Sequence, residues 1–454
     1  MPPLPPVLSL PDELIEEVFF RLPPDEPEHL VRASLACKLL LGLLTGPSFR
    51  RRYRDFHGAP PMLGFLYCWP QFSRQRSEDL LVPQFFPTTK FGARVPDDPW
   101  PDWGDSELAV LDCHHGRVLL GDYDKPMPLI VWDPMTGSRT KLEAPKGCNM
   151  PMNAEPGGAA VLCAVAGCDH SGCHQGPFRV VFFGMSTDGD DNCIIHVRVS
   201  SPETGEWSEQ CPSFDLGIGS FMVRVPPVLI QDALYFIHNI ADLRIGILKY
   251  DVGSNCLSRI DAPRAWAVSD DAIILMAMKD DSLGFAQVNR LTLYLWSRKM
   301  GFDGLASWTK RRVINLNNLL PIQNPDKRLR LFGSVEGRDI VFVTTDLGIY
   351  EIDLKSLQWK KLWKREKFLR LIPYMSFHNP QVYLLEQTFT DIMYYNRMEG
   401  AVDVGGEANR SETAAIEGQR TTATTCRPLT APVDEEDGQH RRTPPAEAGT
   451  AGGG

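Results

Sequence analysis

The sequence lacks any apolar run long enough to cross a membrane. Its most apolar stretch, residues 30–44, is interrupted by Arg32 and Lys38 and falls short of the roughly 20 residues that a spanning helix needs. The first residues show neither the basic segment nor the uninterrupted apolar segment of a secretory signal peptide. We therefore expect no membrane partner and a location in the cytoplasm, the nucleus or both.

An excess of positive charge is also missing. The 47 Lys and Arg face 57 Asp and Glu, which gives a net charge of −10. Because nonspecific nucleic-acid binding needs a positive surface that displaces counterions, this balance argues against a nucleic-acid partner. A folded protein partner suits this charge better. The 11 cysteines are an odd number scattered along the chain, so we expect reduced thiols.

Motifs of known catalytic chemistry are absent as well. The sequence contains no Gly-x-Ser-x-Gly, no His-Glu-x-x-His, no Gly-x-Gly-x-x-Gly and no Gly-x-x-x-x-Gly-Lys-Ser/Thr. His114 and His115 precede a β-prone run without a partnered Ser or Cys motif, which favours turn and packing roles. We therefore expect a protein that is not an enzyme, with no catalytic residue and no cofactor.

One stretch raises the question of a metal site. Residues 163–174 contain three Cys and two His. Structural zinc is usually held by two close ligand pairs, often Cys-x-x-Cys, and no Cys-x-x-Cys occurs in this chain. The spacing therefore favours a flexible loop between two strands, and no metal site is predicted.

Four regions differ in composition. Residues 1–7 are a Pro-rich leader, residues 8–58 have helical periodicity, and residues 60–398 are rich in β-prone runs. Residues 399–454 contain no Phe, Trp or Tyr and are dominated by small and polar residues. Because such a segment can bury too little apolar surface to offset the entropy of ordering, we expect a disordered C-terminal tail there.

The helical region predicts three short helices. Apolar residues recur at helical spacing in the first of them, which Pro23 and Pro24 end: Leu14, Ile15, Val18, Phe19 and Leu22. A second helix is expected from His29 to about Leu44, and a third from Ser48 to about Phe56. Three helices in so few residues bury a small core. Such a module is commonly completed by a partner.

The β-prone region repeats a strand-turn-strand phrase, and its copies begin at Val131, Val199, Lys249 and Tyr350. Aromatic residues in the repeat lie 118, 46 and 54 residues apart, at Trp132, Tyr250, Trp296 and Tyr350. A loose period of about 50 residues is typical of propeller blades.

Residues 108–395 would accommodate five or six such blades, and residues 62–67 would add a strand that closes the ring. A β-sandwich or split barrel is the alternative, because short strands with turns suit either architecture.

The N-terminal motif resembles the F-box over some 45 residues: Leu10 to Pro23, then Leu30 to Lys38, and later Phe49-Arg50. Leu39 and Leu40 stand where that family usually has a Trp, so the apolar character is kept. In the family, this face packs on a Skp-type adaptor that is tethered to a cullin. The resemblance implies eight adaptor-binding residues: Leu10, Pro11, Leu14, Ile15, Val18, Leu22, Leu30 and Val31.

The β-prone region resembles the propeller-like associated domain of plant F-box proteins. The resemblance lies in five short phrases, at residues 111–120, 131–137, 334–342, 352–356 and 372–377. The double glycine of kelch repeats is missing. The fold implied is a small all-α F-box module, a mainly β domain that forms an irregular β-propeller, and a disordered C-terminal tail.

The function implied is that of a substrate-recognition subunit of a Skp-cullin-F-box ubiquitin ligase. The F-box would bind the adaptor and the β domain would bind an unidentified target protein. Two alternatives stay open: an adaptor-binding scaffold that does not ubiquitylate, and a propeller-type binding protein of another kind. Within the β domain, the expected target contacts are two long connections, Asn149 to Gly176 and Phe302 to Arg312.

Overall fold

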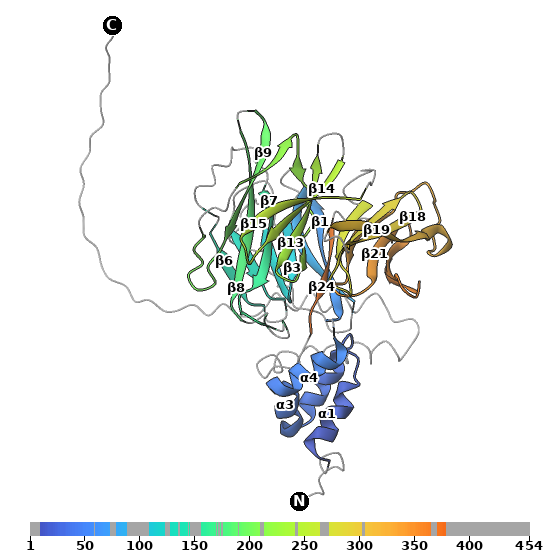
Figure 1. The fold of residues 1–454 in the computed structure, drawn as a ribbon. Coiled ribbons are helices and arrows are strands. Elements are labelled where there is room, and N and C mark those ends of the chain that lie inside the picture. Colours follow the sequence, from blue (N-terminus) through green and yellow to red (C-terminus); the bar gives the residue numbers. More distant parts are fainter. Residues whose placement is uncertain are drawn as a thin grey trace, which may run out of the picture. The chain divides into compact units, whose positions relative to one another are not determined.

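The computed structural model describes residues 10–377, and Figure 1 shows their helices and strands. Gaps in this description are residues 59, 73–78, 89–108, 123–127, 135–136, 144, 146–155, 169, 171–172, 174–175, 189, 209–212, 241–243, 264–271, 302–304 and 365–369. The Pro-rich leader at 1–7 and the predicted tail at 399–454 lie outside the described residues. No helix in the described part of the chain is long and apolar enough to cross a membrane.

The N-terminal module consists of four helices: α1 (Asp12–Phe20), α2 (Glu28–Ala36), α3 (Lys38–Thr45) and α4 (Pro47–His57). Asp12 and Glu13 occupy the first turn of α1, where the helix dipole favours negative charge. Pro47 begins α4, at a position where its missing N–H costs no hydrogen bond. The sequence therefore marks the starts of these two helices well.

The expected second helix from His29 to Leu44 is wrong, because the chain breaks at Cys37. This residue has extended backbone angles, φ −161° and ψ 161°, and separates α2 from α3. The break turns Leu40 and Leu44 of α3 inward, where both are buried. Packing of α3 thus overrides the continuous apolar pattern that predicted one helix.

The helical module has one small apolar core, made by Phe20, Leu30, Leu44, Phe49 and Tyr53. The rings of Phe20 and Phe49 stack with centroids 5.2 Å apart. The Tyr53 hydroxyl donates a hydrogen bond of 2.8 Å to the carbonyl oxygen of Leu22. These contacts hold α4 against the end of α1.

The rest of the described chain forms six antiparallel sheets. One sheet contains β3 (Ala109–His114), β4 (Arg117–Gly121), β5 (Leu129–Trp132) and β6 (Arg139–Leu142). The next contains β7 (Pro156–Cys163), β8 (Phe178–Thr187), β9 (Asn192–Val199) and β10 (Phe214–Ile218). The third contains β11 (Phe221–Met222), β12 (Val228–Ile230), β13 (Ala233–Ile240), β14 (Arg244–Asp251) and β15 (Cys256–Asp261). Each sheet is built from consecutive strands, as propeller blades are.

The next two sheets follow the same pattern. They contain β16 (Ile273–Ala277), β17 (Leu283–Asn289), β18 (Thr292–Met300) and β19 (Ala306–Asn315); and β20 (Arg330–Ser334), β21 (Ile340–Thr345), β22 (Gly348–Asp353) and β23 (Trp359–Trp363). A short 3₁₀ helix, η5 (Leu316–Asn318), begins the connection between them.

The sixth sheet joins the two ends of the β domain. It has the order β2-β1-β24, from β1 (Met62–Phe72), β2 (Asp79–Pro87) and β24 (Arg370–Met375). The innermost strands of neighbouring sheets contact each other around the ring. The contacting pairs are β3 with β7, β7 with β11, β12 with β16, β16 with β20, β20 with β24, and β24 with β3. The sheets therefore form a closed six-bladed β-propeller, which overturns the sandwich alternative and settles the choice between five and six blades.

An apolar cluster fills each of the six junctions between neighbouring blades. Between the second and third blades, for example, Phe183 packs against Phe236 and Tyr250 with ring centroids 4.1 and 5.6 Å away. Each such side chain stabilises the fold by about 1.5–3 kcal/mol when it leaves water. The core of this domain is thus distributed around the ring.

The repeated sequence phrase corresponds to the turn between the third and fourth strands of a blade. Its copies lie between β5 and β6, β9 and β10, β14 and β15, and β22 and β23. In three of them the same hydrogen bond recurs, from Gly137 N to Asp133 O at 2.8 Å, from Gly205 N to Ser201 O at 3.0 Å and from Leu357 N to Asp353 O at 2.8 Å. The four aromatic residues that gave the period all stand on third strands, so the period predicted from the sequence is confirmed.

Candidate functional site

Helix α1 carries an exposed apolar face. Leu14 and Val18 are 52% and 58% exposed, and Leu10, just before the helix, is 43% exposed. Their spacing of four residues places them in one line along the helix, while Ile15 and Phe20 on the other side are buried. An apolar line that the module itself leaves uncovered indicates a surface for a partner.

The eight residues expected to bind an adaptor fall into two groups. Leu10, Pro11, Leu14 and Val18 are exposed. In contrast, Ile15, Leu30 and Val31 are buried, and Leu22 is half-buried against the helical core. The exposed residues can therefore contact an adaptor directly. The buried ones instead hold α1 and α2 in place.

The structure adds Leu39 to the exposed apolar residues of the helical module. It lies at the start of α3 and is 45% exposed. The sequence gave a signal for it, since Leu39 stands where the family usually has a Trp. The set of eight omitted it because the break at Cys37, which turns α3 relative to α2, was not predicted.

Charged residues fix α1 on its polar side. Glu16 pairs with Arg52 of α4, and the guanidinium of Arg52 lies 5.0 Å from the centroid of the Phe20 ring. Exposed ion pairs contribute at most about 1 kcal/mol each. Their role here is to set the orientation of α1, so that its apolar line stays on the outside.

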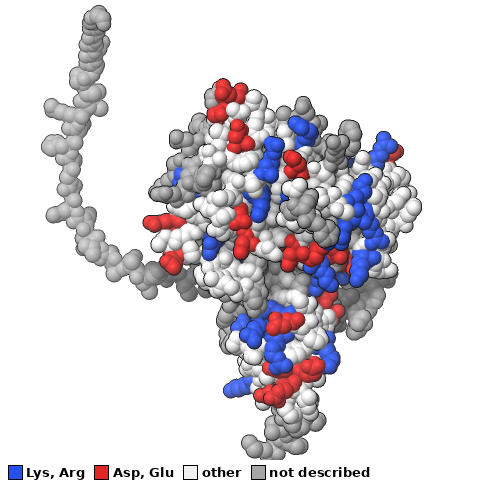
Figure 2. All heavy atoms as spheres, in the orientation of Figure 1, with Lys and Arg blue, Asp and Glu red and all other residues white. Residues whose placement is uncertain are grey.

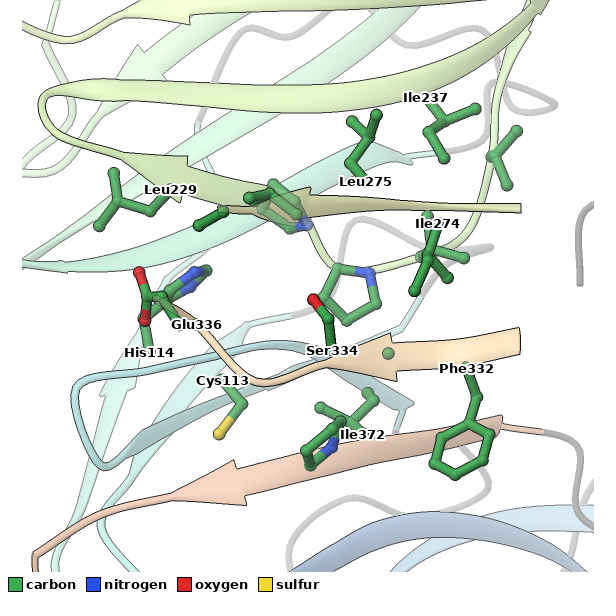
Figure 3. A pocket seen from close by; sticks show the side chains of 18 of the residues that line it. Cys113, His114, Leu229, Ile237, Ile274, Leu275, Phe332, Ser334, Glu336 and Ile372 are labelled. Atoms are coloured by element: carbon green, nitrogen blue, oxygen red, sulfur yellow. The ribbon is translucent and has the colours of Figure 1, made fainter. Parts of the chain in front are cut away.

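A large cavity lies along the axis of the propeller. Its volume is about 1750 Å³ and residues of all six blades line it. Figure 3 shows part of the wall, where His114 and Glu336 lie close together. A channel of this size offers concave surface on which a side chain or peptide segment of a partner could dock.

His114 forms a buried ion pair in the channel wall. Its Nδ1 lies 2.7 and 2.8 Å from the two carboxylate oxygens of Asp112, which also accepts a bond from the Val161 N–H. Burial lowers the pKa of His114, but Asp112, with a further contribution from Glu336, outweighs it and raises this pKa to about 9. His114 is therefore a cation at neutral pH.

This pair predicts a pH dependence of stability. The folded pKa of His114, about 9, exceeds the unfolded value of about 6.5, so its stabilisation is complete below pH 6.5 and is lost as the pH rises through 9. The effect is on the order of 3 kcal/mol. Denaturant unfolding of wild type and His114→Gln at several pH values checks it: the gap between them should shrink from pH 6 to pH 9.5. A constant gap would contradict the assigned charge.

Two neighbouring titratable groups in this wall, Cys113 and His115, are poorly suited to catalysis. Desolvation raises the pKa of Cys113 well above its ordinary value, so the thiol stays protonated and is a weak nucleophile. Burial, together with the neighbouring His114, His170 and Arg117, lowers the pKa of His115 to about 2. His115 occupies the two-residue turn between β3 and β4, with φ 51°, as the turn role predicted.

The two connections expected to contact a target are not loops throughout, and the contact itself stays a prediction. The range Asn149 to Gly176 contains β7, and Phe302 to Arg312 contains most of β19. Both sequences alternate too weakly between apolar and polar residues to be read as strands, yet ladder hydrogen bonds with β8 and β18 hold them. Of the first range, residues 164–176 do form a connection, partly outside the described residues.

Charges of both signs are interspersed on the face of the molecule shown in Figure 2. Lys and Arg lie over β18 and β19 and also over the helical module; on β18 and β19, Lys299, Lys310 and Arg311 are exposed. Such a mixed surface suits a folded protein partner better than a polyanion.

Comparisons with solved structures give weak likenesses. TolB from Acinetobacter baumannii has a TM-score of 0.33 and 10% identity, and the match covers 69% of this chain and 67% of TolB. A puromycin hydrolase mutant has a TM-score of 0.34 and 12% identity, over 57% of this chain and 39% of the hydrolase. No curated protein matches. These scores are too low to carry an argument about function.

Family models, in contrast, match both parts of the chain. Residues 7–52 match the F-box domain, the part that contains the exposed line on α1. Residues 109–382 match the model described as F-box protein AT5G49610-like, beta-propeller, which covers more than half of the chain and the strands from β3 to β24. The chain therefore belongs to the F-box proteins with an AT5G49610-like β-propeller.

Proposed function

We propose that this protein is the substrate-recognition subunit of a Skp-cullin-F-box ubiquitin ligase. The observation that carries the proposal is the exposed apolar line of Leu14 and Val18 on α1 and of Leu10 just before it, on a helix that buries Ile15 and Phe20. F-box domains bind Skp-type adaptors, and this line lies within the F-box match. The adaptor would in turn link the chain to a cullin.

The propeller is the part that would hold the target. A specific interface needs on the order of 800 Å² per partner, and the helical module would commit its exposed apolar residues to the adaptor. The propeller has the central channel, and Ile218 and Phe221, beside the channel residue Ser220, are 61% and 42% exposed. We place target contacts at this channel mouth.

The role proposed is positional and not catalytic. By holding a target near the conjugating enzyme, the chain would raise the effective concentration of a target lysine there. The proposal includes a location in the cytoplasm, the nucleus or both, on the grounds of the odd number of scattered cysteines; imaging of a fluorescent fusion would test it.

Affinity purification from cells with the proteasome blocked tests the function. Wild type should bring down adaptor, cullin and a target that carries ubiquitin. A variant with Leu14→Asp and Val18→Asp should bring down the same target without adaptor, cullin or added ubiquitin, because the substituted line is distant in sequence from the propeller strands.

Two results would contradict the proposal. Recovery of adaptor without cullin and without ubiquitylated target would favour a scaffold that does not ubiquitylate. Loss of the target together with the adaptor in the variant would show that the propeller does not hold the target by itself.

A further inference from the structure

Four potential metal ligands meet in the connection between β7 and β8. Cys163 ends β7, and Cys168, His170 and Cys173 follow it. One ligand atom from each residue lies within 4.8 Å of those from the other three. Cys173 is buried, Cys163 and Cys168 are half-buried and His170 is exposed. Three thiols and an imidazole thus surround one point at the end of a strand.

The distances suit a tetrahedral ion. The Cys173 Sγ and the His170 Nδ1 are 3.6 Å apart. Around zinc with a Zn–S bond of about 2.3 Å and a Zn–N bond of about 2.0 Å, tetrahedral geometry places sulfur and nitrogen about 3.5 Å apart and two sulfurs about 3.8 Å apart. The cluster therefore needs only small adjustments to close around an ion.

Backbone hydrogen bonds hold the connection in this shape. Ala164 N donates to Pro177 O at 3.1 Å, which closes the base of the connection, and Gly176 N donates to Cys173 O at 2.8 Å. Gly167 has φ 64°, a left-handed angle that glycine adopts without strain. This turn folds the chain back, so that Cys163 and Cys168, five residues apart, face the same point.

A neighbouring hairpin supports the cluster with a buried cation. Arg117 is 2% exposed and donates hydrogen bonds to the carbonyl oxygens of Cys173 and Gly176. Three thiolates and a neutral imidazole on Zn²⁺ leave a net charge of −1, which the guanidinium beside them would balance. The buried Arg117 thus favours a negatively charged zinc–thiolate group at this place.

The imidazole ligand is oriented from the same hairpin. The ring of His115 stacks on that of His170 with centroids 3.8 Å apart and planes 3° apart. This stacking restricts the plane in which the His170 ring can lie. Two residues of the β3–β4 hairpin therefore contact the cluster: His115 stacks on His170, and Arg117 binds the backbone of Cys173.

We propose that Cys163, Cys168, His170 and Cys173 bind one zinc ion, which fixes the β7–β8 connection at the wall of the channel. Three thiolates and one imidazole are a donor set typical of structural zinc, and four protein ligands leave no open position for catalysis. His115 and His170 both line the channel, so the ion would shape a surface available to a partner. Ligand spacing in the sequence argued against zinc because the return turn at Gly167 could not be predicted.

The test measures metal content on the full chain, expressed without a metal-binding tag and equilibrated with zinc before dialysis. Elemental analysis should find one zinc per chain in wild type. It should find less than about a tenth of that in the Cys168→Ser, Cys173→Ser double variant. The matched control is Cys256→Ser, an exposed free cysteine on β15, which should retain the full equivalent. Cobalt in place of zinc should give the visible bands of a tetrahedral, thiolate-bound ion.

If the double variant does not fold, two substitutions of the exposed His170 test the proposal instead. His170→Cys should retain one zinc, because four cysteines also bind it, whereas His170→Asn should weaken zinc binding at least tenfold. Near-ultraviolet circular dichroism of the metal-free proteins checks that both variants fold. Wild type without zinc, or a folded double variant that keeps it, would overturn the proposal.

Discussion

Replacing Leu14 and Val18 together by Asp should abolish binding of a Skp-type adaptor and leave the fold intact. Both side chains are more than half exposed, so neither substitution buries a charge in the free protein. In the complex each carboxylate would be forced into an apolar contact, at a cost of at least about 2 kcal/mol. Two such costs lower the affinity roughly a thousandfold. Pull-down and calorimetry with purified adaptor would measure this loss.

The matched control places the same substitutions on exposed apolar residues of the propeller. Met300 and Leu305 are each 71% exposed, and Met300→Asp with Leu305→Asp should leave adaptor binding unchanged. Melting temperatures of both double variants should stay near that of wild type. Adaptor binding that survives in the α1 variant would mean that the line on α1 is not the docking surface.

The sequence predicted the F-box module, but not which of its apolar residues face outward. Leu14 and Ile15 are neighbours with the same chemistry, and yet one is 52% exposed and the other 2%. Periodicity predicts which side of a helix is apolar. Which of those apolar residues are buried in the module and which stay exposed for a partner depends on where the other helices pack. That packing depends on the extended backbone at Cys37, for which no residue in the sequence gives a signal.

The propeller was predictable because its repeat has a local cause. After four of the third strands the turn carries an Asp or Ser and a following Gly or Ser, and these residues recur along the chain. The Asp353 carboxylate, for example, accepts bonds from the backbone N–H groups of Lys355 and Ser356 at 2.8 and 2.7 Å. First strands lack such a turn, which explains why β7 was mistaken for part of a loop.

Ring closure depends on residues far apart in the chain. The closing blade takes β1 and β2 from one end of the domain and β24 from the other. The local sequence patterns, strand runs and turns, predict a closing strand at residues 62–67 but do not show that the innermost strand of that blade comes from residues 370–375. Only the order of the blades around the axis reveals this pairing.

Deleting residues 370–454 should therefore unfold the propeller, whereas deleting 398–454 should not change it. The first deletion removes β24, whose Leu371, Ile372 and Tyr374 are buried, and with it the hydrogen bond from the Tyr374 hydroxyl to Gly116 O at 3.0 Å. At about 1.5–3 kcal/mol for each buried side chain, the loss approaches the whole stability of a typical domain, about 5–15 kcal/mol. The deletion also opens the ring, because β24 lies between β20 and β3.

Soluble yield and thermal unfolding of the two truncated chains check this expectation. The chain that ends at residue 397 should melt within about a degree of wild type, since the predicted tail offers no aromatic residue to bury. The chain that ends at residue 369 should be insoluble or melt without a cooperative transition, because strand β1 then lacks its inner neighbour and exposes an unpaired edge. Equal melting of both chains would show that β24 does not close the ring, and a drop of several degrees in the longer chain would show that the tail packs.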